Sequence, residues 1–187
     1  MIFYHYSSLL NYSIKVTIYM VDLSRRNFFR GKKTSTPSAI RLPWVINEQV
    51  FIDNCTQCGD CATTCEENII VKGSGGFPEI DFSKGECSFC QKCIDVCEQP
   101  LFVNNRDTSK SAWQLNIQIK NNCLAVNQVV CQSCQDSCET EAISFKYQQS
   151  TIPQPQIELD KCNGCGACVS ICPKSSIELT PKVVELI

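Results

Sequence analysis

The chain is 187 residues long, carries a net charge of −2 and contains 16 cysteines but a single histidine, His5. This cysteine content would suggest a disulfide scaffold in a secreted protein, but many of the cysteines crowd into short loops where they are poorly placed to pair with one another. Structural zinc is also less favoured, because such sites usually combine two cysteine pairs about a dozen or more residues apart. Convergent thiolates favour iron–sulfur clusters in a reducing compartment. With one histidine, we expect no acid–base catalysis by that residue type.

Residues 1–19 are apolar and rich in tyrosine, yet polar residues interrupt them too often for a membrane span. Met20 follows directly. We interpret Met20 as the true start and residues 1–19 as an over-long gene start, which the intact mass of the native protein would settle. We therefore expect no transmembrane segment.

Residues 20–48 form a basic arm and linker with a net charge of +4, whereas residues 49–187 have a net charge of −7. A basic arm on an acidic body suggests docking onto a partner protein, although a solvated, flexible tail would have the same composition. We expect no nucleic-acid partner, because no aromatic-interleaved basic surface accompanies the arm.

Within the arm, residues 24–29 (SRRNFF) match the S-R-R-x-F pattern of twin-arginine export signals. An export signal needs an apolar run next, but residues 30–37 (RGKKTSTP) are polar. We therefore expect a cytoplasmic protein whose N-terminal region resembles an export motif. Arg25 and Arg26 are candidate partner-binding residues.

Four cysteine motifs follow the arm, and the last has the spacing C-x2-C-x2-C-x3-C-P of bacterial 4Fe-4S ferredoxins. The second motif lies 32 residues after the first, and the fourth lies 75 residues after the second. The cysteines of the third lie 73 residues after their counterparts in the first. This regularity indicates a duplicated pair of motifs. The candidate cluster ligands are Cys55, Cys58, Cys61 and Cys65 in the first motif, Cys87, Cys90, Cys93 and Cys97 in the second, Cys131, Cys134 and Cys138 in the third, and Cys162, Cys165, Cys168 and Cys172 in the fourth.

The third motif lacks its first cysteine, since Gln128 occupies the position equivalent to Cys55. Cys123 stands five residues upstream, and we expect it to complete the cluster through a wider loop; the alternative is a spare thiol. The sequence thus predicts three 4Fe-4S clusters and a fourth that depends on Cys123. The looser loop could instead hold a 3Fe-4S cluster. Iron counts address this, because four cubanes need about 16 irons and three need about 12.

Short alternating apolar stretches between the motifs are typical of strands, and a helical turn should lead from the third to the fourth cysteine of each motif. We expect strands at residues 69–71, 79–82, 113–119, 142–145, 156–159 and 176–179. The predicted fold is α+β, with two fused bacterial two-cluster ferredoxin-like domains, residues 49–108 and 109–187. Their apolar cores are small, so the clusters should stabilise the fold and the apo form should be largely unfolded.

In two-cluster ferredoxins, the fourth cysteine of each motif binds the cluster of the partner motif. This crosswise pairing predicts four ligand sets, with a motif-by-motif assignment as the simpler alternative. The crosswise sets are Cys55, Cys58, Cys61 and Cys97; Cys87, Cys90, Cys93 and Cys65; Cys123, Cys131, Cys134 and Cys172; and Cys162, Cys165, Cys168 and Cys138.

Glu66, Glu98 and Glu139 follow the fourth cysteine of the first three motifs, whereas Pro173 follows it in the last. An ionised carboxylate near a cluster disfavours an added electron, so we predict lower reduction potentials there. Solvated helix caps are the alternative interpretation of these glutamates.

Several segments together resemble the NapF family, the ferredoxin-type accessory proteins of the periplasmic nitrate reductase system. They are the SRR-containing arm, RLPW at residues 41–44, GSGGFP at 73–78, ECSFC at 86–90, the displaced Cys123, and CQSCQDSCE at 131–139. The resemblance extends from about Asp22 to the last motif and leaves residues 1–19 uncovered.

The resemblance implies a cytoplasmic protein that binds the precursor of the nitrate reductase catalytic subunit. It would help to mature this subunit before export, by supplying electrons or Fe-S clusters. The alternative is an electron-relay polyferredoxin, or a subunit that serves a membrane quinone-linked oxidoreductase. We expect no enzyme activity, because no nucleotide motif or nucleophile constellation accompanies the clusters.

Overall fold

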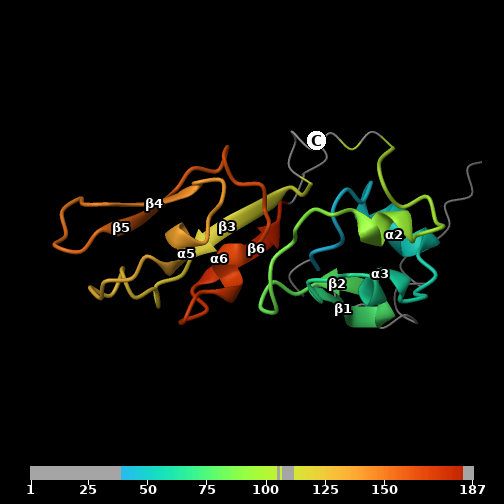
Figure 1. The fold of residues 1–187 in the computed structure, drawn as a ribbon, viewed down its shortest axis with the longest axis horizontal. Coiled ribbons are helices and arrows are strands. Elements are labelled where there is room, and N and C mark those ends of the chain that lie inside the picture. The colour runs from blue at the N-terminus through green and yellow to red at the C-terminus, as the bar shows by residue number, and fades with distance from the viewer. Residues whose placement is uncertain (1–38, 105, 107–111, 183–187) are drawn as a thin grey trace, which may run out of the picture. The chain divides into compact units, whose positions relative to one another are not determined.

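Short helices and two-stranded sheets, joined by cysteine-containing loops, make up the fold in the computed structural model (Figure 1). The structure describes residues 39–104, 106 and 112–182. The expectations for residues 1–19, for Met20 as the start, and for Arg25 and Arg26 lie outside these residues. Within the described part of the chain, no helix is both long and apolar enough to span a bilayer.

Each cysteine motif contains one four-residue helix, which begins one residue before the third cysteine and ends two residues before the fourth. The helices are α3 (Asp60–Thr63), α4 (Lys92–Asp95), α5 (Ser133–Asp136) and α6 (Ala167–Ser170). The predicted helical turn is therefore confirmed in all four motifs. Because one turn of helix advances the chain by about 5.4 Å, the fourth cysteine lies away from the loop that carries the first three.

Six short strands pair into three antiparallel sheets of two strands each, within the described residues. The predicted strands are confirmed, with ends shifted by one or two residues. The pairs are β1 (Ile70–Lys72) with β2 (Pro78–Ile80), β3 (Leu115–Ile119) with β6 (Ile177–Pro181), and β4 (Ile143–Lys146) with β5 (Gln154–Ile157). A 3-10 turn, η1 (Ser74–Gly76), connects β1 to β2 within the glycine-rich stretch.

Helix α2 (Glu48–Asn54) has no counterpart among the predicted elements. The Asn47 side chain accepts a hydrogen bond from the Val50 N–H at 2.8 Å and caps the helix. Phe51 and Ile52 are its buried residues. The helix starts at the last residue assigned to the basic arm, so the arm ends within the folded part of the chain.

Arg41, counted with the basic arm in the sequence, is part of the folded core. Its guanidinium donates to both carboxylate oxygens of Glu48, at 2.8 and 2.9 Å, and to Glu79 at 3.3 Å. It also stacks on the rings of Phe51 and Phe77, at 5.0 and 5.8 Å from the centroids. These contacts compensate the charge of Arg41, so this residue does not contribute to a free basic surface.

The first and second motifs form the first motif pair, and the third and fourth form the second. Residues of the two pairs share one hydrophobic core. Trp113 packs edge-on against Phe82, with ring centroids 5.6 Å apart, and its indole N–H donates to the Arg41 carbonyl at 2.8 Å. The Cys87 N–H donates to the Cys165 carbonyl at 2.8 Å. A side chain and a backbone contact thus connect the two motif pairs directly.

Candidate iron-sulfur cluster sites

Four cavities in the structure are each lined by four cysteines. We name each cavity after one of its cysteines. The Cys55 cavity contains Cys55, Cys58, Cys61 and Cys97; the Cys87 cavity contains Cys65, Cys87, Cys90 and Cys93; the Cys123 cavity contains Cys123, Cys131, Cys134 and Cys172; and the Cys162 cavity contains Cys138, Cys162, Cys165 and Cys168. Every cysteine of the chain lines one of these cavities, and none lines two.

The grouping follows the crosswise pattern. Three cysteines of each set come from one motif, and the fourth comes from the partner motif of the same pair. Cys97 leaves the second motif and lies with the first, while Cys65 does the reverse. The lining of the cavities therefore corresponds to the crosswise ligand sets and not to the motif-by-motif alternative.

Backbone turns explain how three cysteines of one loop reach the same cavity. In the first motif, Gln57 and Gly59, which flank Cys58, both have left-handed φ angles, of 61° and 89°. The second motif repeats this pattern around Cys90, and the fourth repeats it around Cys165. Left-handed residues reverse the chain tightly, so the second cysteine turns back toward the side that the first and third face. The third motif lacks this pair of turns around Cys131 among its described residues.

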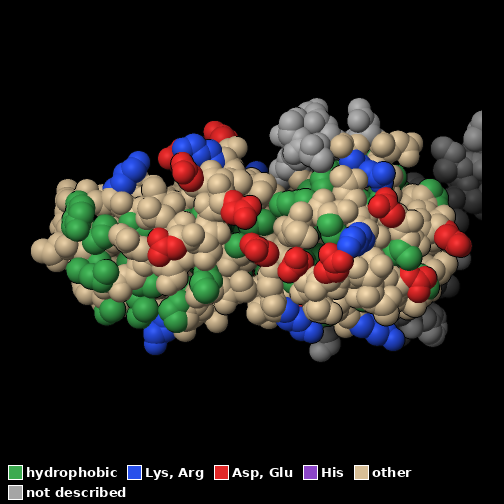
Figure 2. Space-filling model, in the orientation of Figure 1, with side chains coloured by type: hydrophobic (Ala, Val, Ile, Leu, Met, Phe, Trp, Pro, Cys, Tyr) green, Lys and Arg blue, Asp and Glu red, His purple; other side chains and the backbone are tan. Residues whose placement is uncertain are grey.

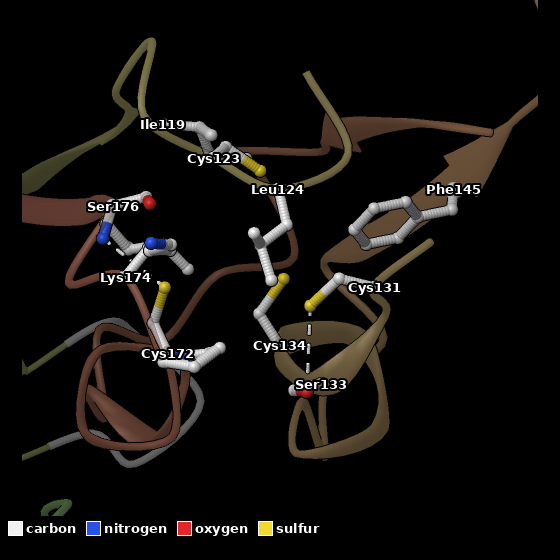
Figure 3. Close-up of a pocket in the computed structure, with 12 residues that line it drawn as sticks. Ile119, Cys123, Leu124, Cys131, Ser133, Cys134, Phe145, Cys172, Lys174 and Ser176 are labelled. Atoms are coloured by element: carbon white, nitrogen blue, oxygen red, sulfur yellow. Dashed lines mark hydrogen bonds between the residues drawn. The ribbon is translucent and has the colours of Figure 1, made fainter. Parts of the chain in front are cut away.

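The third motif instead brings Cys123 to its cavity through a wider loop (Figure 3). The loop is closed by Asn127, whose backbone and side-chain N–H groups both donate to the Cys123 carbonyl, at 3.0 and 2.8 Å. Gln128, which occupies the regular ligand position, is exposed and accepts a hydrogen bond from Ser150 at 3.0 Å. Cys123 therefore lies where the missing cysteine of the third motif is needed.

Burial makes several of these thiols weak acids. It raises the pKa of Cys93 and Cys168 from 9.0 to about 12, and neighbouring cysteines add to the rise. The pKa values of Cys61, Cys87 and Cys134 rise to about 11, with burial again the main cause. These thiols are protonated near neutral pH when nothing binds them, so cluster binding must release protons and should strengthen as pH rises.

Cys172 differs from these thiols because its pKa is lowered. Burial alone would raise the pKa, but backbone N–H groups of Ser176, Lys174 and Ile177 outweigh it. The Ser176 N–H lies 3.3 Å from the Cys172 sulfur. The nearby Ser176 hydroxyl adds to the effect without making a hydrogen bond of ordinary geometry. A thiolate at Cys172 is therefore stabilised before any metal binds.

The donor sets fit iron–sulfur clusters better than single ions. All sixteen cysteines are free, so none is held in a disulfide. Among the described residues, no three Cys, His, Asp or Glu side chains converge closely enough to bind one metal ion. A cubane is larger, because iron and sulfide separate its four thiolate ligands, and a ring of four cysteines around a cavity suits that size. Such clusters would supply one-electron redox chemistry when bound.

The predicted acidic neighbours are distributed unevenly. Glu98 lines the Cys55 cavity and Glu66 lines the Cys87 cavity, but Glu139 does not line the Cys162 cavity. Glu66 also forms an ion pair with Lys92 on the surface. An ion pair with a cation weakens the field of a carboxylate, so Glu98 should influence its cluster more than Glu66 does.

Sequence reasoning missed one set of cavity residues, which lie four positions after the last cysteine of each motif. They are Ile69 in the Cys87 cavity, Leu101 in the Cys55 cavity, Ala142 in the Cys162 cavity and Ser176 in the Cys123 cavity. We call this the roof position. An alignment of the four repeats against one another shows the position but not its burial.

Comparisons with known proteins agree with this chemistry. A 4Fe-4S binding domain model matches residues 52–68, and a 4Fe-4S dicluster domain model matches residues 129–176. Together with the cysteine-lined cavities, these matches define the class: the chain is a 4Fe-4S ferredoxin-type protein. It is 44% identical over 157 residues to the ferredoxin-type protein NapF of Escherichia coli K12, an alignment that covers 84% of this chain and 94% of that protein. The chain belongs to the NapF family, which confirms the resemblance noted in the sequence.

Two further comparisons bear on function. The ferredoxin-type protein NapF of Haemophilus influenzae is 44% identical over 168 residues, with 84% of this chain and 94% of the relative covered. One subunit of an ion-translocating oxidoreductase complex from Methanosarcina acetivorans is 31% identical over 130 residues, which is 67% of this chain and 46% of that protein. No solved structure is significantly similar to the chain. Ferredoxin-type proteins are electron carriers or accessory proteins, so this protein is not an enzyme.

Proposed function

We propose that this protein binds the precursor of the periplasmic nitrate reductase catalytic subunit in the cytoplasm and helps to mature it before export. It would do so by supplying electrons or Fe-S clusters. Membership of the NapF family over most of the chain is the observation that carries this proposal.

We further propose that the protein holds four clusters in two pairs, one for each ferredoxin-like domain. The support is that all sixteen cysteines line four cavities in the crosswise sets. In this proposal Cys123 is a ligand and not a spare thiol. The protein's own residues would bind the clusters, keep them apart from one another and limit their contact with water.

The proposed recognition element is the arginine pair of the basic arm, Arg25 and Arg26. The charge contrast between the arm and the acidic body supports a docking role. Arg41 takes no part in this proposal, because Glu48 and Glu79 compensate its charge. Recognition would then depend on the residues before the folded core.

An anaerobic capture from native cytosol tests the partner. The bait is the full chain, compared with a variant in which Arg25 and Arg26 are both replaced by Gln. A matched control replaces Lys32 and Lys33 by Gln, which removes the same charge outside the SRRNFF segment. We expect the full chain and the lysine variant to recover the catalytic-subunit precursor with its export signal attached, and the arginine variant to lose it.

A second candidate function is an electron relay within a membrane-associated oxidoreductase. The similarity to one subunit of an ion-translocating oxidoreductase complex favours it, although the match spans less than half of that protein. If the capture recovers membrane oxidoreductase subunits and no precursor, the maturation proposal is wrong and the relay is the better explanation. Equal loss of precursor in the arginine and lysine variants would instead assign recognition to net charge alone.

A further inference from the structure

The Cys123 cavity has a roof residue unlike those of the other three cavities. Ile69, Leu101 and Ala142 are apolar and no more than 3% exposed, whereas Ser176 is polar and fully buried. In the first, third and fourth motifs, a left-handed residue just before the roof position turns the chain inward. In the last of these it is Ser175, at φ 46°. The same turn thus carries a hydroxyl into one cavity and hydrocarbon into two others.

The Ser176 hydroxyl has no hydrogen-bond partner among the described residues. The backbone of Ser176 is held on both sides, because its N–H donates to the Cys172 sulfur at 3.3 Å and its carbonyl accepts from the Lys120 N–H at 2.7 Å. The side chain therefore cannot move out to water without breaking these bonds. Buried hydroxyls nearly always have a partner, and the cavity that Ser176 lines is the space in which its hydroxyl can find one.

Sulfur atoms are the acceptors that this cavity gathers. Figure 3 shows Ser176 on one wall beside Cys172, with Cys123, Cys131 and Cys134 around the same space. A cluster bound by these four thiolates would bring its own sulfides into the same space, each a hydrogen-bond acceptor.

The charged lining points the same way. Lys174 lines the Cys123 cavity, and no Lys or Arg among the described residues lines any of the other three. The Cys55 cavity is lined by Asp60 and Glu98, and the Cys87 cavity by Glu66 and Glu67. Cationic side chains and hydrogen-bond donors both stabilise the more negative, reduced form of a cluster.

We propose that the Ser176 hydroxyl donates a hydrogen bond to a sulfur of the cluster held in the Cys123 cavity and, with Lys174, makes this cluster the most readily reduced of the four. The reduced form gains one electron and no proton, because the proton stays on the serine oxygen. This inference rests on the proposed fourth cluster but not on the proposed partner. Ser176 is thus a tuning residue that acts on the cluster without ligating it.

Ser176→Ala tests the bond with little structural cost, since alanine is the roof residue of the third motif. The full chain is prepared anaerobically and titrated with dithionite, with each cluster followed by electron paramagnetic resonance. We expect one cluster to become about tenfold harder to reduce, which for a one-electron couple is a midpoint lowered by about 59 mV. Ser144→Ala is the matched control, because the Ser144 hydroxyl is also buried and unpartnered but Ser144 lines none of the four cavities. It should shift no midpoint.

Cys123→Ala assigns the signal, because it removes a ligand from this cavity alone. If the signal that Cys123→Ala alters is the one that Ser176→Ala shifts, the proposal is supported. An unchanged midpoint in fully loaded Ser176→Ala protein, or a shift in a different cluster, overturns it. If Cys123→Ala changes neither the iron content nor any signal, Cys123 is a spare thiol and the proposed four-cysteine cluster of this cavity fails, whichever partner protein the chain binds.

The reciprocal change keeps the inference testable if Ser176→Ala protein does not load iron. Ala142→Ser places a hydroxyl at the roof of the Cys162 cavity, which has no charged lining residue among those described. We expect the cluster assigned to this cavity to become easier to reduce by a similar factor. A loaded Ala142→Ser protein with unchanged midpoints would contradict the proposal.

Discussion

The Cys55 cavity and the Cys123 cavity occupy equivalent places in the repeat, yet their loops and linings differ. The first uses the regular cysteine spacing and is lined by Leu101, Asp60 and Glu98. The second depends on a displaced cysteine and is lined by Ser176 and Lys174. Cysteine spacing thus selects the cavity, while residues just beyond the last cysteine, together with Asp60 in the first motif, set its polarity and charge.

The surfaces of the two motif pairs also differ in hydrophobic and acidic residues. Exposed hydrophobic side chains follow Cys123 in its loop, at Val126, Val129 and Val130, and Tyr147 is exposed at the end of β4. Figure 2 shows hydrophobic side chains gathered near the β4–β5 end of the described chain, and acidic side chains over both motif pairs. Ten acidic residues lie among residues 39–104, which contain the first motif pair, and six among residues 112–182. Acidic surroundings lower a reduction potential, so we expect the two motif pairs to differ in their reduction potentials.

Removal of all clusters should have the largest effect, because it acts on both motif pairs. Because cluster binding supplies much of the folding free energy of so small a core, we expect iron chelation to abolish most of the secondary structure seen by circular dichroism. The Trp113–Phe82 contact and the shared core predict that both motif pairs unfold in one transition. Two separate transitions as iron is withdrawn stepwise would show instead that the pairs are independent domains.

Loss of one ligand should affect one cavity. We expect Cys123→Ala to reduce the iron content from about 16 to about 12 per chain, or to leave about 15 if a three-iron cluster remains. Val126→Ala, an exposed change in the same loop, should retain every iron. Chemical iron and sulfide analysis of anaerobically purified protein measures this. Full iron content in Cys123→Ala would return Cys123 to the status of a spare thiol.

Alanine substitutions at two equivalent glycines, one in each motif pair, should destabilise the protein to different extents. Gly59 and Gly166 each follow the second cysteine of a motif and have φ angles of 89° and 88°. A Cβ on Gly59 would meet nothing within 4 Å, whereas one on Gly166 would lie 2.0 Å from the Phe82 ring. We expect Gly59→Ala to cost about 1–2 kcal/mol from backbone strain, and Gly166→Ala to cost about 1–3 kcal/mol more from overpacking.

The temperature at which the visible absorption of the clusters is lost provides the measurement for both glycine variants. Gly166→Ala should lose its clusters at a clearly lower temperature than Gly59→Ala. Equal losses would mean that Phe82 moves aside freely and that the contact between the motif pairs is weak.

Charge substitutions at the two cavities should give the smallest effects. Glu98→Gln should raise the midpoint potential of the Cys55 cluster, and Lys174→Gln should lower that of the Cys123 cluster, each by a few tens of millivolts at most for exposed charges. Both shifts should shrink in high salt, because mobile ions screen exposed charges. Shifts of the same sign for the two variants would refute the electrostatic explanation.

The cysteine pattern predicted much of the candidate site. The regular intervals between motifs located the ligand candidates, and the known habit of the fourth cysteine predicted the crosswise grouping that the cavities show. Cys123 was found because the third motif lacked one ligand and a cysteine stood nearby. The cavities group the cysteines as predicted because ligand spacing is local: a cluster requires its thiolates within a short loop, and the sequence shows that directly. That these cysteines bind clusters stays a prediction.

Other features required contacts between distant residues. The role of Arg41 depends on Glu79 and on the rings of Phe51 and Phe77, and in the sequence it was only another basic residue of the arm. Helix α2 escaped prediction because seven residues with two buried side chains carry a weak periodic signal. The roof position can be located by aligning the four repeats, but its burial in a cavity cannot be predicted from them.

The sequence by itself determined the class of cofactor, the motif pairs, the strands and the short helices of the motifs, and the family. The tertiary structure alone decided which side chains line each cavity beyond the cysteines, and that Ser176 is buried there without a partner. The physical reason is that ligand number and spacing are properties of one loop. Burial, in contrast, depends on segments that meet only when the chain folds, such as β3, just before the Cys123 loop, and β6, which pairs with it.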